Sequence, residues 1–147
     1  MRLLLQRVER AEVRVEASVV GRIGRGLVVL VGVGHRDTAA VAAHLAGRVV
    51  DLRIFRDEEG RTNRSLADTG GQVLAISQFT LYADTRRGRR PSFLDDAPPA
   101  HGEALYRTYA EGLEALGVTV ARGVFGASME VELVNDGPMS IWLDSDA

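Results

Sequence analysis

The sequence contains no cysteine. Disulfide bonds and thiolate chemistry are therefore excluded, and the reducing cytoplasm is the simplest compartment to expect. The sequence also lacks an apolar run of the roughly 18 to 20 residues that a membrane span requires, because the longest run, Leu27 to Val33, is interrupted by Gly32. The N-terminal stretch Met1 to Val13 is charged too early and too often for a signal peptide. We therefore expect no membrane partner.

Metal ligands and cofactor motifs are scarce as well. The three histidines, His35, His44 and His101, have no metal-ligand spacing between them, and each is expected to be solvated. The glycines of "GVGHRD" lack the third glycine that a dinucleotide site requires. We expect no metal and no cofactor, whereas a serine–histidine–aspartate triad stays open because its members are rarely adjacent in sequence.

The formal net charge is −2, which gives no global attraction to nucleic acid, and no DNA partner is expected. The distribution of charge is uneven, however. Four arginines lie within five residues: Arg86, Arg87, Arg89 and Arg90. They could form a local patch that grips phosphates, or they could simply be a solvated loop.

What is present indicates one strand-rich α+β domain over residues 1–147, because no linker and no internal repeat divides the 147 residues. Alternation and β-branched runs predict eight strands. They are Leu3–Val8, Ala11–Val15, Val19–Ile23, Leu27–Val33, Arg53–Phe55, Gln72–Leu81, Met129–Val134 and Met139–Leu143, and a further strand is predicted at Val118–Ala121.

Two principal helices are expected to pack on the β-sheet layers. The first opens at Asp37-Thr38 and carries Val41, Leu45 and Val49 on one stripe. The second runs from about Pro99 to Leu116 and is ended by Gly117. A long polar loop, Ala83 to Pro98, precedes it.

The segment "SQFT" presents polar side chains where an apolar strand stops. Ser77, Gln78 and Thr80 follow the buried run Val73 to Ile76, and a sheet holds such terminal side chains rigidly. Ser77 and Thr80 are three residues apart, so in a regular strand they point to opposite faces. With no histidine or lysine nearby to activate a hydroxyl, a side-chain nucleophile is not expected, although backbone N–H groups could polarise a carbonyl.

A second unusual segment, "VNDGPMS", joins two predicted strands. Asn135-Asp136-Gly137 alone predicts a hairpin turn, and Pro138 then removes a backbone donor and fixes φ. The segment is therefore either a hairpin tip or a backbone shaped for recognition.

Together these segments carry a resemblance. "SQFTL", "ADTRRGRRPSF" and "VNDGP", with "QRV", "RIFRDEEG", "EALYRTY" and "FGASM", closely resemble the bacterial-type D-aminoacyl-tRNA deacylases over almost the whole chain. The resemblance implies a D-Tyr-tRNA deacylase-like fold and a homodimer. It also implies hydrolysis of the ester between a D-amino acid, or glycine, and the terminal adenosine of tRNA, with tRNA-Ala mischarged with glycine as a further substrate.

The resemblance also implies roles for particular residues. Ser77, Gln78, Phe79 and Thr80 would form the catalytic pocket floor, and Phe125, Gly126, Ala127 and Met129 would receive the adenosine. Gly137 and Pro138, joined by a cis peptide and held by Arg7, would enter the partner subunit's pocket and exclude L-aminoacyl groups. The chemistry would come from backbone groups and the 2′-OH of the substrate, and the arginine loop would contact tRNA.

The chain departs from the family pattern at Met139 and Ser140, where the usual motif continues Gly-Pro-Val-Thr, and at Thr62, where methionine is common. Two alternatives remain beside the chiral deacylase. One is a module that binds the tRNA 3′ end without hydrolysis, and the other is a deacylase of relaxed specificity with a trans Gly-Pro bond.

Overall fold

Six strands form the main sheet of the computed structural model, which describes every residue from Met1 to Ala147. The strand order is β2-β1-β3-β6-β7, and β8 pairs with the other side of β1. Their bounds are β1 Arg2–Val15, β2 Ser18–Ile23, β3 Gly26–Gly32, β6 Gln72–Ser77, β7 Val120–Arg122 and β8 Glu130–Asp144. A separate two-stranded ribbon contains β4 Phe55–Arg56 and β5 Thr62–Arg64.

Strand β1 organises this sheet because it pairs with three others. Its first half is antiparallel to β3, its second half is antiparallel to β2, and β8 runs antiparallel along its opposite edge. The prediction of two strands at Leu3–Val8 and Ala11–Val15 was therefore wrong. The polar pair Glu9-Arg10 resembled a break in the pattern, but the chain continues through it with only a shift in register.

The sheet curls towards closure. A Cβ atom on Gly21 of β2 would lie 2.8 Å from the carbonyl oxygen of Arg122 in β7, so the two ends of the strand order approach each other closely. A cluster of seven buried residues fills the inside of this curl: Val8, Ala11, Val13, Ile23, Val28, Leu74 and Ile76. Strand twist and bulges allow such curvature.

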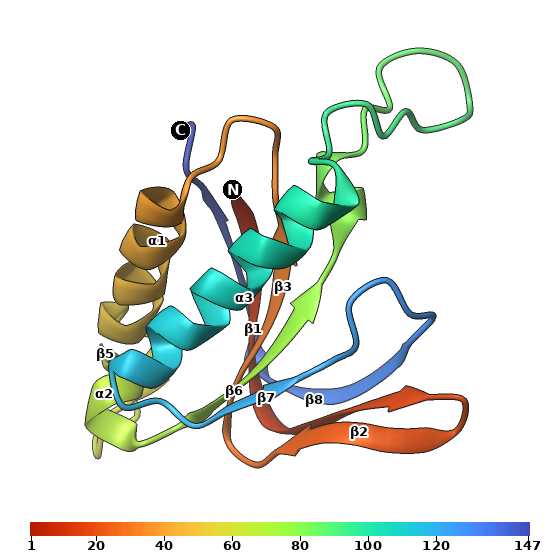
Figure 1. Cartoon of the computed structure of the whole chain (residues 1–147). Helices are drawn as coiled ribbons and strands as arrows, with labels where there is room; N and C mark the ends of the chain where they lie inside the picture. Colours follow the sequence, from red (N-terminus) through yellow and green to blue (C-terminus); the bar gives the residue numbers. More distant parts are fainter.

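Helices α1 (Ala39–Asp51) and α3 (Pro99–Ala115) cover one face of the sheet (Figure 1). Thr38 caps α1 by accepting a hydrogen bond from the Val41 amide, as expected at a helix start. Buried positions such as Leu45, Val49, Tyr109 and Leu113 pack into a cluster of 22 core residues between the helices and the sheet. Burial of this apolar stripe is what fixes the helices on that face.

Two smaller features differ from the sequence prediction and a third agrees with it. A short helix α2, Leu66–Thr69, was missed, although Ser65 and Asp68 form a capping box at its start. Helix α3 ends at Ala115, and Leu116 is exposed after it. The C-terminal glycine was correctly placed, since Gly117 has a φ of 90°.

Strand β6 also stops earlier than predicted. It ends at Ser77, and a 3₁₀ helix, η1, spans Phe79–Tyr82, where strand had been expected to Leu81. Its parallel neighbour β3 ends at Gly32, and the last β-type bond runs from the Gln78 amide to the Val31 carbonyl at 2.8 Å. Beyond that point there is no partner strand, so the chain turns.

Strand β8 contains the segment "VNDGPMS", which the sequence left open as a hairpin tip or a backbone shaped for recognition. Met129–Val134 and Met139–Leu143 do not form two strands, because both halves pair with β1 in the same direction. The excess residues bulge outwards between the pairs Gln6↔Ser140 and Val8↔Asn135, so that Asp136 to Met139 lie opposite Arg7 alone. We call residues 136–139 the β8 bulge. No helix in the fold has the length and apolarity that crossing a membrane would need.

Candidate functional site

A pocket of about 360 Å³ opens where β3 and β6 end. These strands are parallel, with Val31 beside Ser77, so their carboxyl ends meet at one edge of the sheet. The edge beyond the carboxyl ends of parallel strands is a common position for ligand sites. The residues that line the pocket are Val31, Val33, Ile76, Ser77, Gln78, Phe79, Asp96, Ala97, Pro99, Gly102, Phe125, Gly126, Ala127, Met129 and Val131.

Three of the four residues of the "SQFT" segment line this pocket. Ser77 and Gln78 are half-buried and Phe79 is 50% exposed. Thr80 is exposed and does not line it; its hydroxyl accepts a hydrogen bond from the Gln78 side chain. Thr80 does not line the pocket because β6 ends at Ser77 and the chain turns into η1, so Thr80 does not take the direction that a continued strand would give it.

Phe79 and Thr80 are the first two residues of η1. The N–H groups in the first turn of a helix have no acceptor within the helix itself. They stand beside the pocket at the end of a buried strand, which holds them in a fixed position. Such groups can stabilise negative charge that develops on a carbonyl oxygen.

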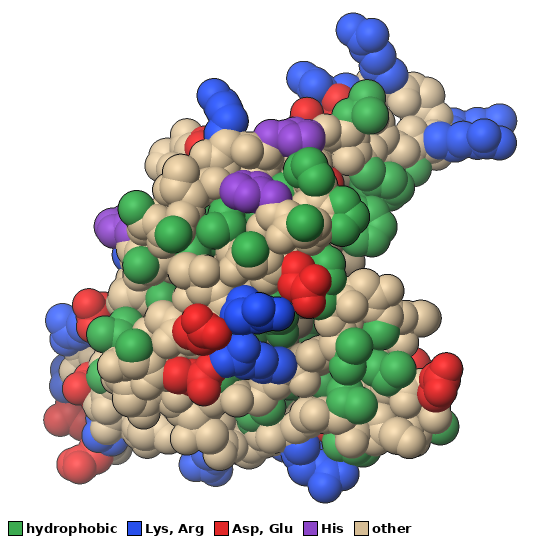
Figure 2. All heavy atoms as spheres, in the orientation of Figure 1, with side chains coloured by type: hydrophobic (Ala, Val, Ile, Leu, Met, Phe, Trp, Pro, Cys, Tyr) green, Lys and Arg blue, Asp and Glu red, His purple; other side chains and the backbone are tan.

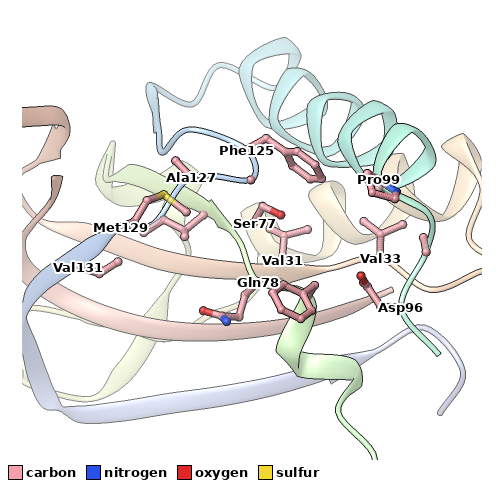
Figure 3. Close-up of a pocket in the computed structure, with 15 residues that line it drawn as sticks. Val31, Val33, Ser77, Gln78, Asp96, Pro99, Phe125, Ala127, Met129 and Val131 are labelled. Atoms are coloured by element: carbon pink, nitrogen blue, oxygen red, sulfur yellow. The ribbon is translucent and has the colours of Figure 1, made fainter. Parts of the chain in front are cut away.

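An aromatic wall stands on the opposite side of the pocket. Phe125 packs against Tyr106 of α3 with ring centroids 6.2 Å apart. The Tyr106 hydroxyl donates to the Ala75 carbonyl at 2.7 Å, and burial raises the pKa of Tyr106 to about 12, so the ring is anchored as a neutral group. Phe125 therefore offers a held aromatic face on which a base could stack. Figure 3 shows Phe125 above Ser77, with Ala127, Met129 and Val131 towards one end of the pocket.

The pocket contains no histidine, lysine, arginine or cysteine, and Asp96 is its only titratable side chain. No histidine or lysine therefore lines the pocket beside Ser77, and the Ser77 hydroxyl has no hydrogen bond to any base that could activate it as a nucleophile. His35 and His101 do not enter the pocket either: their Nε2 atoms lie 2.7 Å from the Leu94 carbonyl and 3.0 Å from the Asp37 carbonyl. His101 is half-buried, in contrast to the solvated position expected for it.

The β8 bulge lies apart from this pocket within one chain. Gly137 and Pro138 are exposed, their peptide bond is cis, and neither residue lines the pocket. The base of the bulge is held by Asn135, whose side-chain amide donates to the carbonyls of Arg7 and Met139, both at 2.9 Å. Within one chain the Gly-Pro pair is therefore exposed and lies outside the pocket lining.

Arg7 lies beneath the bulge and is only 4% exposed. Its Nη1 donates to the Ile54 carbonyl at 2.7 Å, and its Nε donates to the Asp136 carbonyl at 3.2 Å and pairs with the Asp136 carboxylate at 3.1 Å. Arg56 also binds that carboxylate, at 2.8 and 2.9 Å. The Arg56 hydrogen bonds, together with the charges of Arg7 and Arg56, lower the pKa of Asp136. Two arginines therefore hold the residue that precedes Gly137.

Comparison with known proteins supports what these segments indicate. The model of the D-Tyr-tRNA(Tyr) deacylase family matches residues 4–144. The chain belongs to this family. It is 59% identical to a D-aminoacyl-tRNA deacylase of Thermomicrobium roseum, over 99% of this chain and 94% of that protein. It is also 59% identical to a D-aminoacyl-tRNA deacylase of Paracoccus denitrificans, over 99% of this chain and 97% of that protein.

Two solved structures share the deacylase-family fold. The structure of the c-Myc DNA unwinding element binding protein is 36% identical, covers the whole of both chains, and has a TM-score of 0.93. A probable eukaryotic D-amino acid tRNA deacylase, 21% identical over 97% of each chain with a TM-score of 0.85, shows the same fold. The predicted α+β, D-Tyr-tRNA deacylase-like fold is thereby confirmed.

Among the residues that the family resemblance named, Phe125, Gly126, Ala127 and Met129 all line the same pocket as Ser77. The arginines at positions 86, 87, 89 and 90 lie instead on an exposed loop that projects from the body of the molecule, and Figure 2 shows basic side chains gathered at its tip. Within this loop Arg86 pairs with Asp84 at 2.7 Å, so it is less available to a phosphate than the other three. No group of three or more histidine or acidic side chains could hold a metal ion in this family member.

Sequence reasoning missed several pocket residues. Val31 and Val33 looked like ordinary buried strand, and Gly102 like a helix residue, because only the meeting of β3 with β6 and α3 makes them a wall. Asp96 had a weak signal in "DDAPPA", since an acidic residue shortly before a helix is usually attributed to the helix itself.

Proposed function

We propose that this chain hydrolyses the ester bond of D-aminoacyl-tRNA and releases the free D-amino acid and tRNA. The observation that carries the proposal is the pocket itself. It combines the rigid end of β6, the first backbone N–H groups of η1, and an anchored aromatic face, in a chain that belongs to the D-Tyr-tRNA(Tyr) deacylase family. The terminal adenosine would stack on Phe125, between Gly126, Ala127 and Met129, which places the ester beside Ser77, Gln78 and Phe79.

The chemistry we propose uses no side-chain nucleophile. The N–H groups of Phe79 and Thr80, at the start of η1, would bind the carbonyl oxygen as negative charge develops on it. The ribose 2′-OH of the substrate would assist the attack of water on the ester. The absence of histidine and lysine from the pocket lining and the position of Thr80 outside it support this mechanism.

Selectivity is the second part of the proposal. We infer a homodimer in which Gly137 and Pro138 of one subunit enter the pocket of the other and block L-aminoacyl groups. Exclusion suits the task, because one rigid backbone obstacle can refuse a stereochemistry while the pocket accepts many D-side chains. The exposure of the bulge, its anchoring by Arg7, and the unpaired outer edge of β8 with exposed Val131, Val134 and Trp142 support this arrangement. Such a filter would also admit glycine, including glycyl-tRNA-Ala.

The substrate is large and anionic, so the projecting arginine loop is the surface that we propose for the acceptor stem. The cytoplasm, where tRNA is charged, is the compartment we propose for the reaction.

The deciding experiment incubates the purified protein with D-Tyr-tRNA and, separately, with L-Tyr-tRNA, and follows the fraction of tRNA still charged. Rapid loss of the D-ester alone is the expected result. Equal decay of both at the rate without protein would leave only a binding module. Loss of both esters would indicate a deacylase of relaxed specificity. Because one solved relative is named for binding DNA, duplex DNA is included as a competitor, and inhibition by it would contradict selective tRNA binding.

A further inference from the structure

The carboxylate of Asp96 forms no salt bridge within the chain. Asp96 is half-buried at the pocket wall, and it is the only titratable residue there. It takes part in no salt bridge and in no side-chain hydrogen bond, although nearly every other half-buried acidic group pairs with an arginine, as Glu12, Asp84 and Asp136 do. Asp96 is half-buried rather than enclosed, and because the chain supplies it with no cationic partner, a cation that enters the pocket would meet an unpaired carboxylate.

The surroundings of Asp96 are also suited to binding a cation. Burial raises the pKa of Asp96, while the backbone N–H of Ala97 and the nearby His35 act in the opposite direction. The protein thus compensates the charge of this carboxylate only in part. The walls around it are apolar, with Val33, Ala97 and Pro99 among the lining residues, so a positive charge that enters there would meet Asp96 with little competition from other anions.

The position of Asp96 in the pocket indicates which part of the substrate its carboxylate could contact. In Figure 3, Asp96 lies with Val33 and Pro99 at one end of the pocket, Ala127, Met129 and Val131 lie towards the other end, and Ser77 is between them. If adenosine occupies the end near Ala127 and Met129, the aminoacyl group extends past Ser77 towards Asp96. The cation that every aminoacyl ester carries, whatever its side chain, is the α-ammonium group.

We propose that Asp96 is a specificity-determining residue that binds the α-ammonium group of the aminoacyl ester and thereby orients the ester over the backbone donors of η1. This inference rests on the proposed deacylase function. It adds a requirement that the Gly-Pro filter does not supply: the substrate must have a free, protonated α-amino group. Esters in which that group is acylated or replaced would be poor substrates.

The test compares two esters of the same tRNA that differ in one group. One is D-Tyr-tRNA, and the other is the D-configured α-hydroxy analogue, in which hydroxyl replaces the ammonium group and the side chain is unchanged. Wild-type protein, Asp96→Asn and Asp95→Asn are assayed for kcat/KM on both esters. Asparagine keeps the shape of aspartate and removes its charge, and Asp95 is an exposed neighbour that does not line the pocket, so its variant is the matched control.

We expect the wild-type protein to favour the ammonium ester by about ten- to a hundredfold in kcat/KM relative to the hydroxy ester, the range of a hydrogen bond to a charged group. Each kcat/KM is first divided by the rate of uncatalysed hydrolysis of the same ester, since the two differ in intrinsic reactivity. Asp96→Asn should lose most of that preference by slowing the ammonium ester alone, and Asp95→Asn should keep it.

Three results would overturn the proposal. An equal loss on both esters with Asp96→Asn would make Asp96 a general base or a support for the start of α3. No loss on either ester would make it a solvated wall residue. A wild-type protein that hydrolyses both esters equally well would show that the α-ammonium group is not recognised. If the wild-type protein hydrolyses neither ester, the deacylase function itself fails, and that outcome is distinct from the other three.

Discussion

Replacing Arg7 by methionine tests whether a buried guanidinium holds the β8 bulge in place. Methionine fills much of the same apolar path but removes the charge and all donors. It leaves the buried Ile54 carbonyl without its donor and takes from Asp136 its contacts to a side chain that is only 4% exposed. Arg56→Met is the matched control, because Arg56 also binds Asp136 but has a side chain that is 47% exposed.

The magnitude follows from the contacts. Breaking a buried ion pair by removing one partner costs about 3 to 5 kcal/mol, and the low end applies because Asp136 keeps Arg56 and is itself partly exposed. We expect Arg7→Met to lower the free energy of unfolding by about 3 kcal/mol, which lowers Tm by about 6 to 12 °C for a domain of this size. Arg56→Met should cost about 1 kcal/mol or less, as is usual for an exposed pair.

Urea denaturation at several protein concentrations provides the measurement, since association of subunits would make apparent stability depend on concentration. Hydrolysis of D-Tyr-tRNA and L-Tyr-tRNA by each folded variant is measured beside it. Arg7→Met should raise the rate on the L-ester relative to the D-ester, because the Gly-Pro pair loses its support. Equal destabilisation by Arg7→Met and Arg56→Met, together with unchanged rejection of the L-ester, would refute the reasoning.

The remaining predictions concern charge, backbone fit, mechanism and tRNA binding. Asp136 has a lowered pKa in the folded chain, so its stabilising contribution is present above the unfolded pKa of about 3.9 and is lost as pH falls through the folded pKa. The difference in unfolding free energy between wild type and Asp136→Asn, measured by urea titration, should therefore shrink below about pH 4. A difference that persists there would show that the Asp136 carboxylate is not stabilised by Arg7 and Arg56. A Cβ at Gly26 would lie 1.8 Å from the Gln72 carbonyl oxygen, so Gly26→Ala should lower the free energy of unfolding by more than about 4 kcal/mol. Gly47→Ala in α1, where nothing lies within 4 Å of the added Cβ, should be neutral or stabilise the fold by about 0.5 to 1 kcal/mol. Similar Tm values for the two variants would show that the β3–β6 contact is not as close as described. Thr80→Ala and Ser77→Ala should keep most of the deacylase activity, while a substrate with 2′-deoxyribose at its terminal adenosine should react far more slowly. A loss of several orders of magnitude in kcat with Thr80→Ala would instead indicate that the Thr80 hydroxyl is the nucleophile. Replacing Arg87, Arg89 and Arg90 by glutamine should weaken tRNA binding and reduce its salt dependence by about one unit of slope per lost phosphate contact, and unchanged affinity at low salt would leave the loop without a role in binding.

Much of the fold was readable from local patterns. Thr38 and Gly117 mark helix ends by capping and by positive φ, and both act within a few residues of themselves. The alternation of β1 and the apolar runs of β3 and β6 gave their strand character correctly, because burial on one or both faces imposes those patterns.

The predictions for "VNDGP" and "SQFTL" failed for the same reason, which is that strand pairing outweighed local sequence preference. "VNDGP" has the composition of a turn, yet it lies within β8, because pairing of both flanking segments with β1 outweighs the local preference. In the same way, "SQFTL" has strand character but turns at Gln78, because β3 ends and offers no further partner. Local propensity cannot report where a neighbouring strand stops.

The sequence by itself determined the family, the positions of the polar strand end, the Gly-Pro pair and the arginine loop, and the lack of a thiol, because these depend only on which residues follow one another. The tertiary structure alone decided which of them meet. It brought Ser77, Phe125 and Asp96 to one pocket, from segments far apart in the chain, and turned Thr80 away from it. It also set the Gly-Pro bulge on Arg7, outside the pocket of its own chain. Contacts of this kind depend on strand pairing and helix packing over long sequence separations, and those are properties of the whole fold.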